Sequence, residues 1–328
     1  MTEASVVICA HTLDRWDELN AAVASVHAQT RPAREIYVVT DYNEVLRERA
    51  ESEIEGVRVV PNTKEPGLSG GRMTGADLVT AEVVAFLDDD AIADPRWLEE
   101  LLQAYENPNV LGAGGSVEPM WRELPPSWFP GEFGWVIGCT YNGMPVQNGR
   151  IRNPIGANMS VRREVLYRAG GFASQMGRQK AGFSISSKAK AGGKAESCEE
   201  TEFCIRAARL HPGGYFAYRP GARVQHIVPA QRGTWRYFVH RCLVEGTAKG
   251  VLTDLTGTKD GLSSEGRYVR EVLPQAVMHN LGAAMRGDTG AARRALVIVA
   301  GLVITAFAYG KTRVERRRSN SARIDAVF

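Results

Sequence analysis

The feature that most constrains the fold is a regular alternation of short apolar runs and helical stretches in the first third of the chain. The apolar runs predict strands, and the segments between them have the apolar spacing of amphipathic helices. The predicted strands are Ser5–Ala10, Glu35–Thr40, Val57–Pro61 and Val83–Leu87, and the predicted helices are Trp16–Ala28, Glu44–Glu53, Gly70–Val79 and Arg96–Glu106. This alternation predicts an α/β fold with a doubly wound, mostly parallel sheet. We expect Asp94 to cap the last of these helices, with Pro95 in its first turn.

The strongest local signal is an acidic triplet directly after the fourth predicted strand. Asp88, Asp89 and Asp90 follow the run VVAFL. In a doubly wound sheet, ligands bind beyond the carboxyl ends of the strands. Alternation along an extended strand places Asp88 and Asp90 on one side and Asp89 on the other. Two carboxylates on one side suit Mg²⁺ bound together with substrate phosphates, and the alternative is a solvated turn.

A glycine-rich segment enters the third predicted helix. It runs from Gly67 through Leu-Ser-Gly-Gly to Arg72. Backbone amides at a helix start, together with a guanidinium, suit a diphosphate. The segment fits neither the dinucleotide fingerprint nor the P-loop, and such an entry is commonly only a turn.

Two further features carry titratable side chains. Glu199 and Glu200 begin a predicted helix over Glu199–Arg209. Acidic residues at a helix start also simply complement the helix dipole, so a structural role is the alternative to a catalytic one. His226 follows a strand-like run and is either a metal ligand or a structural histidine.

The middle of the chain is irregular. Met120–Gly138 is rich in Pro, Gly and Trp, and Trp128 and Trp135 within it either pack in the core or stack on sugar rings. Gln175–Ser197 is dominated by Gly, Ser, Ala and Lys. This composition predicts a surface loop. Because the loop directly precedes Glu199 and Glu200, we hypothesise that it closes over a bound substrate.

The C-terminal third has a helical pattern and ends in an unusual segment. Ala295–Gly310 is 16 residues without a charge, and residues 291–328 contain eight Lys and Arg against two Asp and Glu. As a helix the segment spans about 24 Å, less than the roughly 30 Å of a bilayer core. We therefore expect residues 295–318 to lie on an anionic membrane surface, with a buried core helix and a solvated basic tail as the alternative.

Composition limits the other function classes. Lys and Arg number 40 against 37 Asp and Glu, which argues against a nucleic-acid-binding protein. The five cysteines include no C-x-x-C pair, so we expect neither a disulfide framework nor a structural zinc site. The sequence begins with MTEAS and a strand-like run without a signal-peptide pattern, which predicts a cytoplasmic location at the inner face of the cell membrane.

Taken together and in order, these motifs resemble family 2 glycosyltransferases of the GT-A fold. The resemblance rests on VVICAHTLDR, GLSGGRMTG, FLDDD, NPIGANMSVRREVLYRAGGF, CEETEFCIRA and ARVQH, and covers roughly Ser5 to His226. The later WRYFVHRCLVEG and the apolar segment resemble an actinobacterial branch described as glucuronosyl- or glucosyltransferases with lipid-linked acceptors. The family resemblance implies an inverting, metal-dependent transfer of a sugar from a nucleotide-diphosphate sugar, such as a UDP-sugar, to an acceptor hydroxyl. The acceptor would be lipid-linked, a glycan or a secondary metabolite.

The resemblance also assigns roles by position. The nucleotide-sugar would contact Ala10, Thr12, Asp41, Gly67, Arg72, Asp88 and Asp89. A Mg²⁺ or Mn²⁺ ion would be held by Asp88, Asp90 and His226. The acceptor side would be lined by Asn158, Trp128 and Trp135. Glu200, the second member of the Glu199-Glu200 pair, would be the catalytic base, with Glu199 hydrogen-bonding the acceptor or orienting the site.

Three positions depart from the family pattern. Leu13-Asp14 stands where Tyr-Asn is usual, Met73 replaces a common Asn, and Glu200 replaces Asp with a side chain one methylene longer. Each departure keeps the chemical groups that the reaction requires, so we expect an active enzyme. A nucleotidyltransferase and a non-catalytic carbohydrate-binding homologue are the alternatives. The former usually carries a basic glycine-rich loop where this chain reads AHTLDRWDEL.

The predicted division of the chain follows from these patterns. Residues 1–230 form a glycosyltransferase domain, with a nucleotide-sugar-binding half over 1–117 and an acceptor half over 118–230. Residues 231–328 form a helical C-terminal region.

Overall fold

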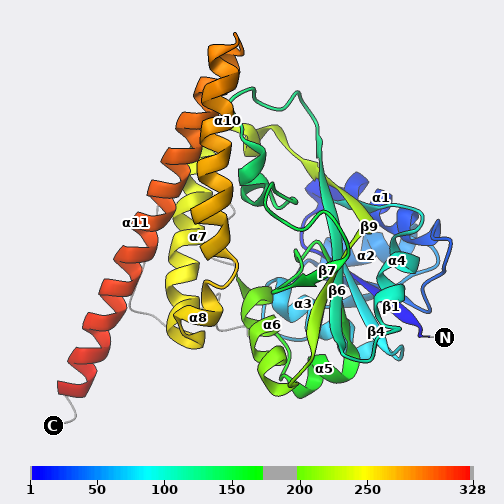
Figure 1. The fold of residues 1–328 in the computed structure, drawn as a ribbon. Helices are drawn as coiled ribbons and strands as arrows, with labels where there is room; N and C mark the ends of the chain where they lie inside the picture. Colours follow the sequence, from blue (N-terminus) through cyan, green and yellow to red (C-terminus); the bar gives the residue numbers. More distant parts are fainter. Residues whose placement is uncertain (1, 173–197, 326–328) are drawn as a thin grey trace.

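The computed structural model describes residues 2–172 and 198–325, and a single mixed sheet lies at its centre (Figure 1). The strands are β1 (Ala4–Ala10), β2 (Ile36–Thr40), β3 (Arg58–Pro61), β4 (Val83–Asp88), β5 (Ala91–Ala93), β6 (Val110–Trp121), β7 (Gly149–Ile151), β8 (Asn158–Arg162) and β9 (Tyr215–Val228). They lie in the order β3-β2-β1-β4-β8-β6-β9-β5, and β7 pairs with β9.

The first four strands of this order pair in parallel, as the alternation predicts. Strand β8 is antiparallel to both of its neighbours, β4 and β6, whereas β9 runs parallel to β6. The short strands β5 and β7 are antiparallel to β9. The predicted α/β fold class is confirmed.

Helices cover both faces of the sheet because the strands bury alternate side chains on opposite sides. On β1, Val6 and Ile8 belong to one hydrophobic core and Val7 to the other. The first core includes side chains of α1 (Trp16–His27), α2 (Glu44–Glu53) and α4 (Trp97–Ala104). The second includes side chains of α3 (Leu68–Leu78), α5 (Arg163–Arg168) and α6 (Glu199–Leu210).

The predicted cap of α4 is wrong. Helix α4 begins at Trp97 with Arg96 before it, and no side chain caps it. Ala91–Ala93 forms β5, which sequence reasoning missed, and the backbone N–H of Asp94 continues this pairing by donating to the carbonyl of Arg223. Asp94 therefore directly follows β5, and its carboxylate accepts a hydrogen bond from the Arg96 N–H in the turn before α4.

The segment predicted to be irregular contains regular structure. Strand β6 extends to Trp121, and Gly131–Ile137 forms a 3-10 helix. The expected loop over Gln175–Ser197 lies outside the described residues and stays a prediction.

The C-terminal residues form a helical layer beside the sheet (Figure 1). Its helices are α7 (Trp235–Thr256), α8 (Thr258–Gly261), α9 (Glu265–Arg267), α10 (Leu273–Met285) and α11 (Thr289–Asp325). Helices α7 and α11 pack closely because Gly246 and Gly250 have no side chain. A Cβ at Gly246 would lie 2.2 Å from the carbonyl oxygen of Thr305, and one at Gly250 would lie 2.8 Å from the side chain of Thr312.

Candidate active site

The candidate site lies where β1, β2 and β4 end. These strands run parallel, so their carboxyl ends meet at one edge of the sheet. Ala10 and Asp88 are the last residues of β1 and β4, and Asp41 directly follows β2. This edge brings together residues that are distant in sequence.

The acidic triplet forms a buried turn. Strand β4 ends at Asp88, and Asp89 and Asp90 lie in the turn that leads to β5. The predicted separation of Asp89 from Asp90 is wrong, because strand alternation stops at Asp88 and one guanidinium, that of Arg15, contacts both side chains. Both aspartates are buried, so the turn is not a solvated one.

Three cationic or potentially cationic side chains face the turn. Arg15 Nη1 lies 2.8 Å from Asp89 Oδ1 and 3.2 Å from Asp90 Oδ2. His226 Nε2 lies 3.2 Å from Asp90 Oδ1, and Arg232 Nη2 lies 3.6 Å from Asp90 Oδ2. Sequence reasoning found His226 but missed both arginines. Arg15 stands inside the quoted motif VVICAHTLDR, whereas no local pattern marks Arg232.

The two aspartates of the turn differ in acidity. Burial raises the pKa of Asp89 to about 7, although Arg15 opposes the increase. Burial also disfavours the charged form of Asp90, but a hydrogen bond from His226 and the nearby positive charges outweigh it, so the pKa of Asp90 is about 2. Asp89 Oδ2 is buried without a hydrogen-bond partner in the described part of the chain.

The chemistry of these donors fits a divalent cation that is completed by substrate. Asp88 and Asp90 supply carboxylate oxygens, which Mg²⁺ and Mn²⁺ prefer, and His226 supplies a nitrogen that Mn²⁺ also accepts. Within residues 2–172 and 198–325, no cluster of three such side chains forms a ready-made metal site. Mg²⁺ commonly takes only one or two protein carboxylates and fills its remaining positions with water and substrate phosphates.

Arg72 on α3 connects the acidic turn to the helix-start glutamates. Its side chain is only 2% exposed. Its Nη1 donates to Glu200 Oε1 at 2.7 Å, and its Nη2 donates to Asp88 Oδ1 at 3.2 Å and to the carbonyl of Gly156 at 3.0 Å. The guanidinium is enclosed by these protein groups, and its expected contact with the nucleotide stays a prediction.

Helix α6 places Glu199 and Glu200 at the same edge. Cys198, which precedes the helix, has φ of 84°, a left-handed conformation that costs a non-glycine residue about 1 kcal/mol or more. Glu199 is buried and accepts a hydrogen bond from Ser69 Oγ. A Cβ at Gly156 would lie 2.2 Å from Glu200 Oε1, so a glycine there gives the carboxylate its space.

The glycine-rich segment is held by Asp41. Its Oδ2 accepts from the backbone N–H of Gly67 at 2.9 Å, and its Oδ1 accepts from Asn62 Nδ2 at 2.7 Å. Asn62 also contacts Thr74 on α3, so this amide, which sequence reasoning did not single out, links the segment to its helix. Asp41 therefore orders the loop beside the sheet edge.

Ala10 at the end of the first strand and Thr12 just after it, both expected to contact the nucleotide-sugar, make local contacts in this structure. The side chain of Ala10 is buried in the core, and its carbonyl accepts from the N–H of Asp41. Thr12 Oγ1 accepts from the N–H of Asp14 and caps a short 3-10 helix over Leu13–Arg15. That helix carries Arg15 to the acidic turn.

Asn158 does not line the acceptor side in this structure. It is fully buried on β8, its Oδ1 accepts from Trp97 Nε1 at 2.8 Å, and its Nδ2 donates to the carbonyls of Ser116 and Ala222. Its amide therefore ties α4 and two strands together. The sequence around Asn158 did not indicate that its side chain is buried at the start of β8.

The two tryptophans lie against the helical layer. Trp128 makes ring contacts with Trp235 and Phe238 of α7. Trp135 Nε1 lies 3.3 Å from the hydroxyl oxygen of Tyr268. Both are partly buried at this junction, and their acceptor-side role stays a prediction.

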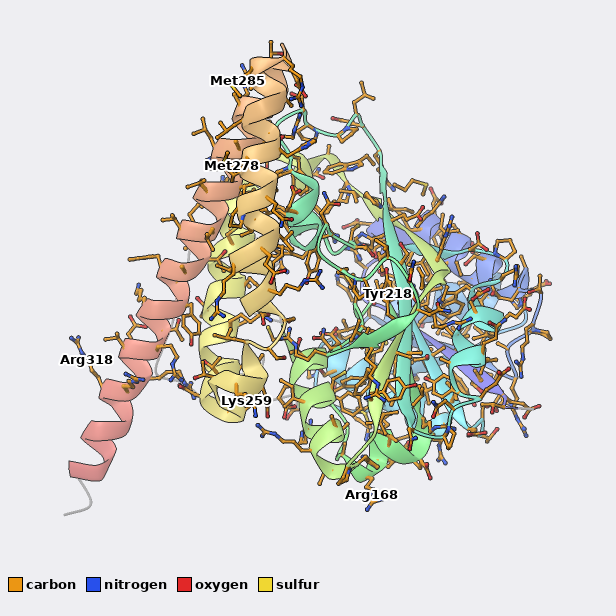
Figure 2. All side chains as sticks on the ribbon, viewed as in Figure 1. Arg168, Tyr218, Lys259, Met278, Met285 and Arg318 are labelled. Atoms are coloured by element: carbon orange, nitrogen blue, oxygen red, sulfur yellow. The ribbon has the colours of Figure 1, made fainter. Side chains whose placement is uncertain are left out.

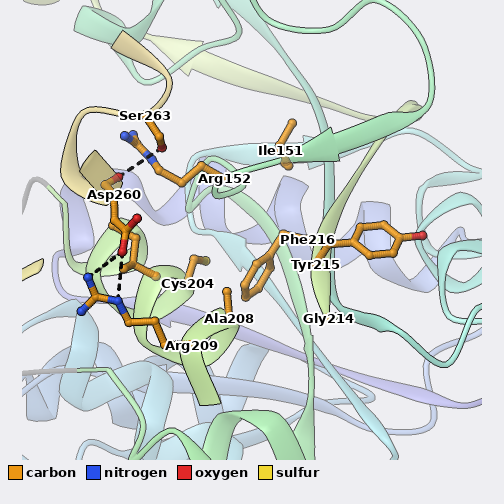
Figure 3. A pocket seen from close by; sticks show the side chains of 11 residues that line it. Ile151, Arg152, Cys204, Ala208, Arg209, Gly214, Tyr215, Phe216, Asp260 and Ser263 are labelled. Carbon is orange, nitrogen blue, oxygen red and sulfur yellow. Dashed lines mark hydrogen bonds and ion pairs between the residues drawn. The ribbon is translucent and has the colours of Figure 1, made fainter. Parts of the chain in front are cut away.

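A cavity of about 350 Å³ lies along the second half of α6, between that helix, β7, β9 and the α8 region (Figure 3). Cys204, Ala208 and Phe216 are among the side chains that line it. Arg209 at its rim is paired with Asp260 at 2.6 Å, as Figure 3 shows. The carboxylates of the sheet edge do not line it, so we do not place the candidate active site there.

Comparisons with known proteins agree with this geometry. The family model described as "Glycosyl transferase family 2" matches residues 5–170. The chain is 34% identical over 254 residues to "Glucosyl-dolichyl phosphate glucuronosyltransferase" of Haloferax volcanii, covering 76% of this chain and 77% of that protein.

Two solved structures share the fold. A mannosyltransferase from Pyrobaculum calidifontis, in complex with GDP-Man and Mn²⁺, superposes with a TM-score of 0.53 at 15% identity, covering 92% of this chain and 86% of that one. GalNAc-T7 with UDP, GalNAc and Mn²⁺ superposes with a TM-score of 0.51 at 20% identity, covering 69% of this chain. The match spans 43% of the GalNAc-T7 chain. These likenesses confirm the GT-A fold.

Proposed function

The chain belongs to glycosyltransferase family 2, and from that premise we propose that it moves a sugar from a nucleotide-diphosphate sugar, such as a UDP-sugar, to an acceptor hydroxyl with inversion. The observation that carries the proposal is the position of Arg72, which contacts both Asp88 and Glu200. One buried side chain thereby joins the donor-side carboxylates to the candidate base. An inverting transfer requires both groups around one anomeric carbon.

The donor side is the acidic turn. Asp88, Asp90 and His226 would hold Mg²⁺ or Mn²⁺, which when bound neutralises the charge that develops on the leaving diphosphate. Asp89 holds Arg15 beside the turn at 2.8 Å. Arg15 thus supplies a further positive charge where a diphosphate would bind.

The nucleoside would bind at the ends of β1 and β2. Ala10 and Thr12 lie there, and Asp41 holds Gly67 at the entrance to α3. We expect these residues to position the base and ribose. The two departures at Leu13 and Asp14 lie in the short 3-10 helix that begins after Thr12, so we expect them to alter the shape of this subsite.

Glu200 is the proposed general base. An acceptor hydroxyl is a weak nucleophile at neutral pH, so a positioned carboxylate must take its proton as the new bond forms. Arg72 holds Glu200 Oε1 at 2.7 Å and so fixes the direction of the carboxylate. Glu199, held by Ser69, lies at the start of the same helix and orients this part of the site. Arg72 acts as a positioning residue in this scheme.

The proposed acceptor is lipid-linked. This follows the name of the relative from Haloferax volcanii, which acts on a dolichyl phosphate carrier by its description. We further propose that residues 295–318 contact the membrane and that the site faces the cytoplasm. The apolar segment and the basic residues around it support this placement.

A donor panel tests the proposal. The purified protein is incubated with UDP-, GDP- and dTDP-sugars, Mg²⁺ or Mn²⁺, and a short-chain lipid-phosphate sugar, and release of nucleoside diphosphate is followed. We expect release with one donor class, and NMR of the product should show the anomeric configuration opposite to that of the donor. Release of pyrophosphate would indicate a nucleotidyltransferase, and binding without release would indicate a non-catalytic homologue.

A further inference from the structure

Helix α11 is apolar on two opposite faces. One face is buried against the other helices of the layer, through side chains that include Ala295, Ile298 and Ala308. Opposite it, a stripe of large apolar side chains is exposed at helical spacing: Leu296, Val299, Val303, Phe307 and Val314. Leu296 is 71% exposed and Phe307 is 66% exposed. A helix packed only on a soluble core would carry polar side chains on this second face.

Helix α10 continues the apolar surface. It contacts α11 along its length, and Asn280 accepts a hydrogen bond from Arg294 of that helix. Its exposed face carries Met278, 68% exposed, Leu281, and Met285, 85% exposed. Figure 2 shows Met278 and Met285 on the outer side of the helical layer, away from the sheet. Sequence reasoning had not singled out this helix.

The charge around these stripes is mainly positive. Residues 272–318 contain eight Lys and Arg against two acidic residues, Asp288 and Glu315. Exposed basic residues lie at both ends of the α11 stripe, with Arg293 before it and Lys311, Arg317 and Arg318 after most of it. Helical spacing places these four on the same half of the helix as Leu296 and Phe307. An apolar stripe between basic groups is complementary to an anionic lipid surface.

Polar contacts hold α11 in the layer at both ends of its apolar segment. Arg313 and Arg316 pair with Asp254 of α7, and Arg294 donates to Asn280 Oδ1 of α10 at 2.9 Å. By length and composition Thr289–Arg318 is, within the described part of the chain, the one helix able to cross a membrane, and 33% of its most apolar window is buried. Crossing would strip the ion pairs with α7 and expose the glycine contacts at Gly246 and Gly250 to lipid.

We propose that the outer faces of α10 and α11 together form one membrane-binding surface that lies parallel to an anionic bilayer. The apolar stripes enter the headgroup–acyl boundary, the basic residues contact lipid phosphates, and α7 stays on the protein side. The inference deepens the membrane contact of the proposed function, because it adds α10 and fixes the orientation. It does not depend on the sugar-transfer chemistry.

Vesicle flotation tests the surface directly. The full chain is mixed with preformed vesicles of phosphatidylcholine and phosphatidylglycerol in a two-to-one ratio, and with pure phosphatidylcholine vesicles. We compare Met278→Glu on α10, Phe307→Glu on α11 and the control Val45→Glu, which changes a 62% exposed residue on α2. Because all three side chains are exposed, we expect the variants to fold, and circular dichroism checks this.

We expect the wild type and Val45→Glu to float with anionic vesicles at low salt and to be released at high salt. Each glutamate on α10 or α11 should weaken partitioning by roughly tenfold or more. Loss of flotation with Phe307→Glu but not with Met278→Glu would overturn the two-helix surface.

Flotation that survives high salt and alkaline carbonate would indicate a spanning helix and overturn the parallel orientation. If the wild type does not float with anionic vesicles, a membrane does not cover this face. If the glutamate variants still float but change their oligomeric state on sedimentation, a second copy of the chain covers it. Donor hydrolysis by the same samples, measured without vesicles, reports separately on the proposed chemistry.

Discussion

The acidic turn Asp88–Asp90 and the helix-start pair Glu199–Glu200 belong to one site, yet the chain surrounds them differently. Asp89 and Asp90 are buried among Arg15, His226 and Arg232. Glu200 contacts a single buried guanidinium, that of Arg72, and its own side chain is 18% exposed.

The difference indicates a division of labour. Clustered carboxylates with positive charge around them suit the binding of a cation and a diphosphate, whose charges must be balanced locally. A carboxylate held by one neighbour and open to solvent on another side suits proton removal from an incoming hydroxyl. The variants below are arranged to separate these two tasks, from the largest expected effect to the smallest.

The largest effect is expected for Asp90→Asn. This isosteric change removes one negative charge from the cluster that would hold the cation, so turnover should fall by at least about 10³-fold. EDTA should abolish the activity of the wild type in the same assay. Asp260→Asn, a change of the same kind on α8, is the control and should keep its turnover. Full wild-type activity in EDTA would show that the reaction does not need a divalent cation.

Glu200→Gln should lower turnover by roughly 10²–10⁴-fold, because it keeps the size of the side chain and removes the base. The matched control is Glu202→Gln on the same helix, whose carboxylate pairs with Arg206. Steady-state kinetics with saturating donor measures the effect. A normal rate for Glu200→Gln with an inactive Glu199→Gln would move the base one residue earlier. Normal rates for both variants would show that Glu199 and Glu200 only stabilise the start of the helix.

Arg72→Lys tests the link between the two groups. A lysine keeps the charge but cannot donate in the fixed fork that reaches Glu200 and Asp88 together. We expect kcat to fall by roughly 10–100-fold, with KM for the donor changed much less, and Arg72→Met to lose more than Arg72→Lys. A rise in donor KM without a fall in kcat would instead support a direct contact between Arg72 and the nucleotide.

The smallest effect concerns the stability of the acidic turn. The pKa of Asp89 is raised to about 7 by burial, so the folded protein binds this proton at pH values where the unfolded chain has released it. The contribution of Asp89 to the free energy of unfolding should therefore fall as pH rises from about 4 to 7. In urea titrations with EDTA present, Asp89→Asn should reduce this fall by roughly 1–2 kcal/mol. An identical pH dependence in the variant would contradict the assignment.

The sequence predicted the fold well where hydrophobic periodicity is local and strong. Helix α2 was predicted with its observed ends at Glu44 and Glu53, and the first four predicted strands lie within two residues of those observed. Strand β5 was missed because three residues carry too little periodicity, and its pairing with β9 comes from far along the chain. The predicted cap at Asp94 was wrong because the pairing with β9, which reaches Asp94, was not visible in the local sequence.

The candidate site was predicted in part. Motif order identified Asp88, Asp90, Glu200 and His226. In the structure Arg72 joins Asp88 to Glu200, and His226 contacts Asp90 in the acidic turn. Arg15 and Arg232 were missed because the contacts of an arginine depend on tertiary packing, which a short motif does not encode. Arg72 and Asn158 were found as positions, but their buried hydrogen bonds could not be read from sequence.

Donor affinity in two variants, measured side by side, tests the division of labour most directly. Calorimetric titration of the active nucleotide-sugar, with and without Mn²⁺, is compared for Asp90→Asn and Glu200→Gln. The account predicts that Asp90→Asn loses metal-dependent donor binding, whereas Glu200→Gln binds the donor within a few-fold of the wild type and still fails to turn it over. Equal losses of donor affinity in the two variants would contradict it.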